Sequence, residues 1–205
     1  MVKYWREVSN VDKRPNPISE RSRRRITEAL ISLMHQKPFG KISIKEVVEE
    51  AGLTRQTFYH KFESKEDVLF QYHEELFSEF IQKLDDTKVT DWEQVVLYFF
   101  RFWQSQSDFV ELLINNGLVF IMERQYPEFF RDIKRQYLGN TGYSDAETDF
   151  IFSFISGALI SLMVDWVRSG EVMTTREITQ LVVELLNGTA LNRTLQSVGM
   201  GSESA

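Results

Sequence analysis

The sequence predicts an all-α protein, and three observations lead to this expectation. The 205 residues include only 4 prolines and 10 glycines, too few for the many turns of a β protein. Apolar residues recur every three to four positions along most of the chain, which is the period of an amphipathic helix. No stretch of the sequence shows the period-two alternation that marks a half-buried strand.

The first helix is expected after an extended lead-in over residues 1–18. Proline lacks the backbone N–H that a continuing helix needs, so Pro38 should end this helix. Its apolar stripe, spaced at i, +3, +4, +7 and +8, consists of Ile26, Ala29, Leu30, Leu33 and Met34.

Two short helices are predicted on either side of Gly52, a residue that suits the left-handed end of a helix. The helix before it begins at Ser43, whose hydroxyl and the carboxylate of Glu46 have the spacing of a capping box. The helix after it begins at Thr54, and a fourth helix begins at Ser64.

The rest of the chain is predicted to form helices separated by polar breaks. A fifth helix is capped by Thr90, and a sixth starts at Ser107 and ends at residues 115–117. A seventh helix runs from Leu118 and bends or breaks at Pro127. A long and almost wholly apolar helix follows over 145–169, and a last helix contains Ile178 to Leu186.

Charge is distributed unevenly along the chain. Residues 1–62 carry 13 Lys and Arg against 7 Asp and Glu, a net charge of +6. Residues 63–205 carry 11 Lys and Arg against 23 Asp and Glu, a net charge of −12. The asymmetry indicates an N-terminal part that binds a polyanion, although charge alone also allows a purely solubilising surface.

Composition and motifs predict no enzyme activity, no metal and no cofactor. Without cysteine the chain has no thiolate zinc site and no iron–sulfur cluster, and His35, His60 and His73 fall on different predicted helices. We expect His60 and His73 to lie at the surface. The sequence contains no nucleophile elbow, P-loop or dinucleotide-binding fingerprint.

The expected location is the cytoplasm, with no membrane contact. Residues 1–16 are polar and lack the apolar core of an export signal. The most apolar stretch, from Phe150 to Val164, is shorter than the roughly 20 residues that cross a bilayer.

The two short helices around Gly52 have the arrangement of a helix-turn-helix, whose second helix enters the major groove of DNA. Phe58 and Phe62 of this second helix should face inward. Its outward residues are nearly all hydrogen-bond donors suited to base edges and phosphates: Arg55, Gln56, Thr57, Tyr59, His60 and Lys61. Periodicity by itself also allows a solvated face on an ordinary helical hairpin.

The run from Lys41 to Val68 resembles the N-terminal domain of the tetracycline-repressor (TetR/AcrR) family. The family pattern Ala-Gly-Val-Ser-x-x-Thr-Phe/Leu-Tyr, followed by Phe-x-Ser-Lys-Glu-Asp/Glu, is matched closely from Ala51 to Asp67. Leu53 and Thr54 are mild departures, and Lys61 stands where the family usually has an aromatic residue or histidine. The resemblance covers residues 19–70 and implies a three-helix DNA-binding domain over 19–66.

The resemblance also implies roles for individual residues. Bases would be contacted by Arg55, Gln56 and Thr57. Phosphate or sugar would be contacted by Tyr59 and Lys61, phosphate by Ser43 and Lys65, and phosphate or a base by Lys45. Thr54 and His60 complete the predicted DNA-binding set. Arg23, Arg24 and Arg25 are further candidate anchors on the DNA backbone.

For the remainder, the resemblance implies a helical regulatory and dimerisation domain over 67–190, followed by a flexible tail over 191–205. The stretch from Phe150 to Gly170 is similar to a Gram-positive subgroup that includes dihydroxyacetone-kinase-operon regulators, some of which respond to a partner protein. The expected effector is therefore either a small apolar molecule or a protein co-regulator.

An aromatic cluster is the candidate effector pocket, since it would accept an apolar or aromatic ligand. Its residues are Phe99, Phe102, Trp103, Phe109, Phe120 and Tyr126. Aromatic residues at helical spacing more often form a core, but these cover more than one face of the fifth helix.

The last two helices are the candidate dimer interface. A helix that is apolar nearly all round must be covered on every side. Small residues at Ser153, Gly157 and Ser161 would let a twofold-related helix approach closely, and Leu181 and Leu185 would complete the seam. The alternative is that both helices simply complete the core of the monomer.

The sequence thus predicts a transcriptional regulator, a repressor, that binds a palindromic operator on double-stranded DNA as a homodimer. Two rivals remain open. One is a regulator or activator controlled by a protein partner, and the other is a helical protein-interaction module that does not bind DNA.

Overall fold

The structure is a computed structural model that describes residues 17–87, 91–124 and 142–188. Within these ranges all regular structure is helical, which confirms the predicted fold class. The elements are α2 (Pro17–Gln36), the 3-10 turn η1 (Phe39–Lys41), α3 (Ile44–Glu50), α4 (Arg55–Tyr59), α5 (Lys65–Asp86), α6 (Trp92–Gln104), α7 (Ser107–Asn115), α9 (Asp145–Arg168) and α10 (Thr175–Leu186).

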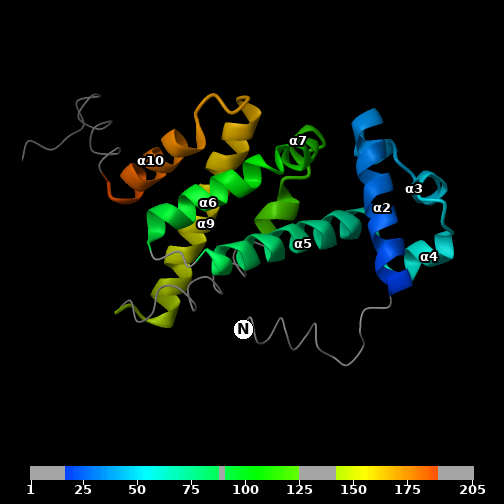
Figure 1. Ribbon diagram of the computed structural model, residues 1–205, viewed down its shortest axis with the longest axis horizontal. Helices are drawn as coiled ribbons and strands as arrows, with labels where there is room; N and C mark the ends of the chain where they lie inside the picture. Colours follow the sequence, from blue (N-terminus) through cyan, green and yellow to red (C-terminus); the bar gives the residue numbers. More distant parts are fainter. Residues whose placement is uncertain (1–16, 88–90, 125–141, 189–205) are drawn as a thin grey trace, which may run out of the picture.

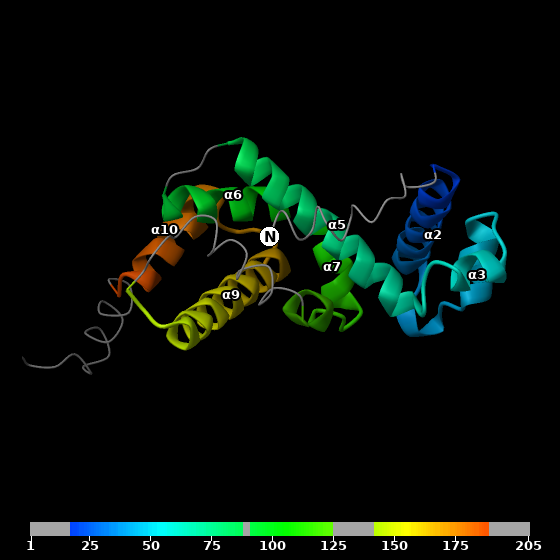
Figure 2. The same ribbon diagram turned by 90° about the horizontal axis from the view of Figure 1, so that it is seen from below.

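The helices form two parts that α5 joins (Figure 1). At one end, α2, α3 and α4 pack together, and this part is termed the head. At the other end lie α6, α7, α9 and α10, termed the body, in which α10 packs against α6 and α9 packs against α7. The view from below shows α5 running without interruption from the head into the body (Figure 2).

One apolar core holds the head together. Leu30 of α2, Val47 of α3, Phe58 of α4 and Leu69 of α5 each have 0% of their surface exposed. Burying side chains of this size stabilises a fold by about 1.5–3 kcal/mol each, which is enough to order the short α3 and α4. Helices of that length are unstable in isolation, so this core fixes where they lie.

Helix starts follow the predicted caps with one exception. The side chain of Thr54 accepts the backbone N–H of Thr57 at 3.1 Å, and Ser43 caps α3 as expected. For α6, however, the prediction of Thr90 was wrong. The carboxylate of Asp91 accepts the backbone N–H of Gln94 at 2.8 Å, so α6 is capped one residue later.

His73 is the clearest difference from the sequence-based expectation of a surface residue. It has 0% exposure, and its ring stacks on that of Trp103 with centroids 5.3 Å apart and 19° between the planes. The reason lies in its position on α5. Leu69 precedes it by one turn and Phe77 follows it by one turn, and both are buried.

The longest described helix, α9, has 24 residues and begins with a capping box formed by Ser144 and Glu147. Among the described residues it is the one helix long and apolar enough, by length and composition, to cross a membrane. The stretch from Phe150 to Val164 lies inside this helix, which continues to Arg168. Less than half of the apolar window is buried within the chain.

Some predicted features lie outside the described residues. They are the lead-in up to residue 16, Thr90, Tyr126, the bend at Pro127 and the tail from residue 191.

Candidate nucleic-acid interface

The turn between α3 and α4 depends on Gly52. Its φ of +58° is left-handed, a conformation that glycine adopts without strain. A Cβ atom at this position would also lie 2.7 Å from Nη2 of Arg25. The turn is closed by the N–H of Leu53, which donates to the carbonyl of Val48 at 2.8 Å. Gly52 thus sets the angle at which α4 leaves α3.

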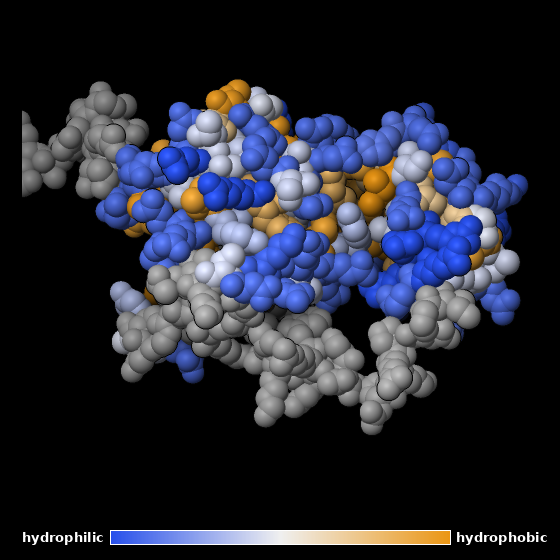
Figure 3. All heavy atoms as spheres, in the orientation of Figure 1, coloured by the Kyte–Doolittle hydropathy of each residue, from blue (hydrophilic) through white to orange (hydrophobic). Residues whose placement is uncertain are grey.

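The outward face of α4 carries most of the predicted DNA-binding residues. Arg55, Gln56, Tyr59 and His60 are exposed, as is the capping residue Thr54. Tyr59 is 61% exposed, which is unusual for so large an aromatic side chain. In the space-filling view, hydrophilic side chains cover much of the surface of the head (Figure 3).

Two residues of the predicted set on α4 are less accessible. The hydroxyl of Thr57 lies 2.9 Å from that of Thr54, and its side chain is half-buried. Lys61 is also half-buried, and its ammonium donates to the hydroxyl of Ser19 on α2. Both stay within the head in this structure, so a role at DNA would require their side chains to turn outward.

On α3, the structure places Ser43 and Lys45 at the surface of the head. Lys45 pairs with Glu49 one turn later, with Nζ and Oε1 3.6 Å apart. An exposed pair of this kind stabilises a helix only slightly and can exchange its partner for a phosphate. Lys45 therefore remains available as a phosphate contact, whereas the hydroxyl of Ser43 donates to Glu46 at 2.8 Å.

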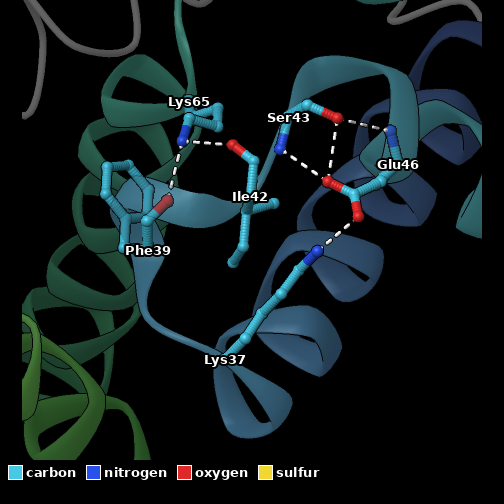
Figure 4. Close-up of polar contacts among 6 residues, drawn as sticks. All are labelled: Lys37, Phe39, Ile42, Ser43, Glu46 and Lys65. Carbon is cyan, nitrogen blue, oxygen red and sulfur yellow. Dashed lines mark hydrogen bonds and ion pairs between the residues drawn. The ribbon is translucent and has the colours of Figure 1, made fainter.

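The capping box of α3 includes a third residue that the sequence pattern does not show. The carboxylate of Glu46 accepts the backbone N–H of Ser43 at 2.9 Å and its hydroxyl at 2.8 Å, and it also pairs with Lys37 from the end of α2 (Figure 4). The hydrogen bonds from Lys37 and Ser43 lower the pKa of Glu46 from 4.5 to about 2.

The lowered pKa of Glu46 predicts that the free energy of unfolding depends on pH. A carboxyl whose pKa is lower in the folded chain stabilises the fold while it is ionised, and that contribution is lost as the pH falls from about 4.5 towards about 2. We expect Glu46→Gln to be less stable than the wild type at pH 7, with a difference that shrinks below pH 4.5.

Urea unfolding at several pH values measures this difference. Glu147→Gln is the matched control, because Glu147 forms the same capping box in α9 and its lowered pKa comes from Ser144 without a lysine. The control should show a smaller loss. A Glu46→Gln deficit that is the same at pH 7 and pH 3 would contradict the prediction.

Lys65 begins α5, where the resemblance places it, but its ammonium bonds to backbone carbonyls of the head. Its ammonium donates to the backbone carbonyls of Phe39, at 2.8 Å, and Ile42, at 2.5 Å, and lies 4.2 Å from the centre of the Phe39 ring (Figure 4). Its side chain is half-buried, and the loss of solvent lowers its pKa. The structure thus directs Lys65 into the head.

The three arginines of α2 point in different directions, as a run of three on a helix must. Arg23 pairs with Glu75 of α5 at 2.9 Å, and Arg24 pairs with Glu28 at 3.4 Å. Arg25 passes close to Gly52. Arg24 is exposed, whereas Arg23 and Arg25 are half-buried, so Arg24 is the most accessible of the three to DNA.

Among the described residues, Asn116 and Asp108 make polar contacts between the body and the head, and the sequence pattern indicates neither contact. The side-chain oxygen of Asn116, just after α7, accepts the backbone N–H of Phe39 at 2.7 Å. At the other end of α7, Asp108 lies 3.2 Å from Nε2 of His35 on α2. The partners are more than 70 positions apart in the chain, so only the fold brings them together.

The predicted pocket residues divide into two groups. Phe99, Phe102, Trp103 and Phe109 are at most 5% exposed and belong to the core of the body. The rings of Phe102 and Trp103 make an edge contact with centroids 5.4 Å apart. Phe120 lies apart from them, 44% exposed and packed against Phe70 of α5.

The predicted dimer residues on α9 lie together along one exposed side of the helix. Ser153, Gly157 and Ser161 are all exposed, and a Cβ at Gly157 would have no atom within 4 Å. The same side carries Phe150 and Phe154, which are 77% and 70% exposed. On α10, Leu185 is 40% exposed and Leu181 is half-buried.

Two family models match this chain. One, described as bacterial regulatory proteins of the tetR family, matches residues 26–72, which cover most of the head and the start of α5. The other, described as a transcriptional regulator C-terminal region, matches residues 90–188, which cover the body from α6 to α10. The first match ends within α5 at residue 72, and the second begins at residue 90, after the end of α5.

Individual proteins agree with the family models. The HTH-type dhaKLM operon transcriptional activator DhaS of Lactococcus lactis subsp. lactis (strain IL1403) is 26% identical over 105 residues, 51% of this chain and 52% of that protein. The chain thus aligns with about half the length of this relative.

Solved structures show the same fold. The dihydroxyacetone kinase operon activator DhaS superposes with a TM-score of 0.55 at 20% identity, over 82% of this chain and 94% of the other. The fatty acid degradation regulator FadR from Bacillus halodurans gives 0.54 at 20% identity, over 86% and 97%.

Proposed function

Because the chain belongs to the TetR family of bacterial regulatory proteins, we propose that it regulates transcription by binding an operator as a homodimer. Members of this family bind DNA and act as dimers. The observation that carries the proposal is the exposed face of α4, where Arg55, Gln56, Tyr59 and His60 project together from a helix held by buried Phe58.

The side chains on this face suit different parts of the duplex. Arg55 and Gln56, in the first turn of α4, have the paired donors and acceptors that read guanine and adenine edges in the major groove. Tyr59, together with Ser43 and Lys45 of α3, suits phosphate oxygens, which position the protein without specifying sequence. The DNA contact set proposed here is therefore Ser43, Lys45, Thr54, Arg55, Gln56, Tyr59 and His60, with Thr57 and Lys61 at its edge.

A palindromic operator follows from the proposed twofold dimer. Two heads related by a twofold axis would meet half-sites about one DNA turn apart, roughly 34–36 Å. The exposed apolar side of α9 supports this arrangement, because large apolar patches on a soluble protein usually mark an interface. We place the dimer contact on Ser153, Gly157 and Ser161 of α9, with Leu181 and Leu185 of α10 at its margin.

Base contacts and phosphate contacts are expected to respond differently to substitution. Arg55→Ala or Gln56→Ala should weaken binding to the preferred duplex by about 1–3 kcal/mol per lost bidentate contact, while binding to an unrelated duplex changes little. Lys45→Ala should weaken both and lower the salt dependence of binding by about one unit.

Fluorescence anisotropy measures these effects at several salt concentrations. The preferred duplex is first selected by the wild-type protein from a random-sequence library, and a scrambled duplex of equal composition serves as the reference. Arg101→Ala is a matched control, because this exposed arginine lies on α6 in the body. Unchanged sequence preference in both Arg55→Ala and Gln56→Ala would refute the assignment of α4.

A protein co-regulator is the second candidate for the controlling signal. The packing of the predicted pocket residues favours this candidate. Phe99, Phe102, Trp103 and Phe109 fill the core of the body, whereas the walls of a small-molecule pocket would border open space. The related DhaS is named an activator, whereas we propose repression, since a dimer on an operator excludes other proteins from the promoter. Transcription of a template that carries the selected duplex decides the direction.

We further propose that the protein acts in the cytoplasm, where its DNA target lies, and that it has no catalytic activity and needs no metal or cofactor. Binding and release of DNA by a regulator require no bond to be made or broken. This part of the proposal rests on the family's role rather than on any single side chain.

A further inference from the structure

We propose that Lys65 is a positioning residue for the DNA-reading helices, acting through the backbone that leads into α3 rather than through a contact with phosphate. This inference rests on the proposed DNA-binding function. It assigns Lys65 a role opposite to the one that the sequence resemblance implies, and three observations support it.

The first observation is the geometry of the ammonium group. Lys65 stands at the first position of α5 and reaches the carbonyl oxygens of Phe39, at 2.8 Å, and Ile42, at 2.5 Å. The remaining side of the ammonium faces the Phe39 ring, 4.2 Å from its centre. Hydrogen bonds from a charged donor are stronger than those between neutral groups, so these contacts are well suited to fix a backbone.

The second observation is where the two carbonyls lie. Phe39 begins η1, and Ile42 directly precedes Ser43, the residue that caps α3. Both Phe39 and Ile42 are buried, at 6% and 2% exposure, and the carbonyl of Phe39 also accepts the N–H of Ile42 at 3.1 Å. By bonding both, Lys65 determines the path of the chain as it enters the helix-turn-helix.

The third observation is a second clamp on the same segment. Lys37, from the end of α2, pairs with Glu46, and Glu46 in turn accepts the backbone N–H of Ser43 at 2.9 Å. Figure 4 shows Lys65 and Lys37 reaching the segment between Phe39 and Glu46 from opposite sides. The start of α3 is therefore fixed to α5 on one side and to α2 on the other.

The consequence for DNA follows from the Gly52 turn. Because α3 and α4 are joined by this short, closed turn, a change in the start of α3 also tilts α4. A phosphate contact by Lys65 would require its ammonium to give up both hydrogen bonds and its contact with the Phe39 ring. Lys65 thus contributes to recognition by orienting Arg55 and Gln56.

Two substitutions separate the possible roles of Lys65. Lys65→Met keeps a long apolar side chain but removes the charge and the donors. Lys65→Gln also removes the charge but keeps an amide N–H that can donate to a carbonyl. Lys45→Met, at an exposed lysine of the same head, is the matched control for loss of a phosphate contact.

Affinity for the selected duplex and for a scrambled duplex is measured over a range of salt concentrations. If Lys65 positions the head, Lys65→Met lowers the preference for the selected duplex about tenfold, Lys65→Gln restores part of it, and the salt slope stays that of the wild type. Lys45→Met instead lowers the salt slope by about one unit and leaves the preference unchanged.

The preference is the decisive readout, because a variant that only folds less well loses binding to both duplexes equally. A salt slope lowered by about one unit in both Lys65 variants, with the preference intact, would overturn the inference and restore the phosphate contact.

Amide hydrogen exchange decides the inference without DNA. Lys65→Met should speed exchange over residues 39–47 about tenfold relative to Lys45→Met, while exchange in the core of α6 stays the same. Equal exchange in the two variants would overturn the positioning role. If the wild type selected no duplex, the proposed function would fail, whereas the exchange result would still decide what Lys65 does.

Discussion

Replacing Gly157 with leucine is expected to raise the dissociation constant of the dimer about 30-fold or more. Overpacking a close contact costs about 1–3 kcal/mol, and a twofold interface contains the substitution twice. Within one chain the new side chain meets nothing, because a Cβ at Gly157 has no atom within 4 Å. The variant should therefore fold normally and lose only its partner.

Sedimentation equilibrium measures the dissociation constant, and circular dichroism checks that the helical content is unchanged. Ser78→Leu is the control, since it adds similar bulk at an exposed helical position on α5. Operator affinity should fall together with dimerisation in Gly157→Leu and stay unchanged in the control. A wild-type monomer at micromolar concentration would refute the dimer. A Gly157→Leu dimer would refute only this contact row.

Trp103→Ala is expected to destabilise the protein by about 3–5 kcal/mol, the usual cost of removing a large buried aromatic side chain. Trp103 has 0% exposure and contacts the rings of His73, Phe99 and Phe102. An alanine would leave a cavity that these rings cannot fill. A loss of this size is a large part of the stability of an ordinary domain.

Urea unfolding followed by circular dichroism gives the free energy, because the substitution also removes a fluorescent residue. Phe120→Ala is the comparison within the same predicted aromatic set, and its 44% exposure limits the expected cost to less than about 2 kcal/mol. A loss below 1 kcal/mol in Trp103→Ala would instead indicate that the aromatic cluster surrounds open space and serves as an effector pocket.

The course of the helices could be predicted from the sequence because local signals agree with one another. Ser43 with Glu46, Gly52 and Thr54 each specify one helix boundary, and the structure confirms all three. Asp91 was missed at the start of α6 because Thr90 beside it is also a favoured capping residue. Choosing between neighbouring caps depends on the tertiary path of the chain.

The surroundings of individual side chains could be predicted less well. For some residues the type of side chain suggested the wrong environment, although the position in the helix indicated the right one. His73 falls on the buried stripe of α5 between Leu69 and Phe77, yet histidine as a residue type is only intermediate in how often it is buried. Lys65 matched a motif, but its partners Phe39 and Ile42 lie more than 20 positions earlier in the chain. Contacts of that kind exist only once the helices have packed.

The short recognition helix also has a consequence for how such regulators diverge. Of the five residues of α4 only Phe58 is buried, so Arg55, Gln56 and Tyr59 contribute little to the core. Substitutions at exposed positions usually change stability by no more than about 0.5 kcal/mol. After a gene duplication, one copy could therefore acquire a new target through one or two point mutations while its fold, and the pairing proposed through α9, stayed intact.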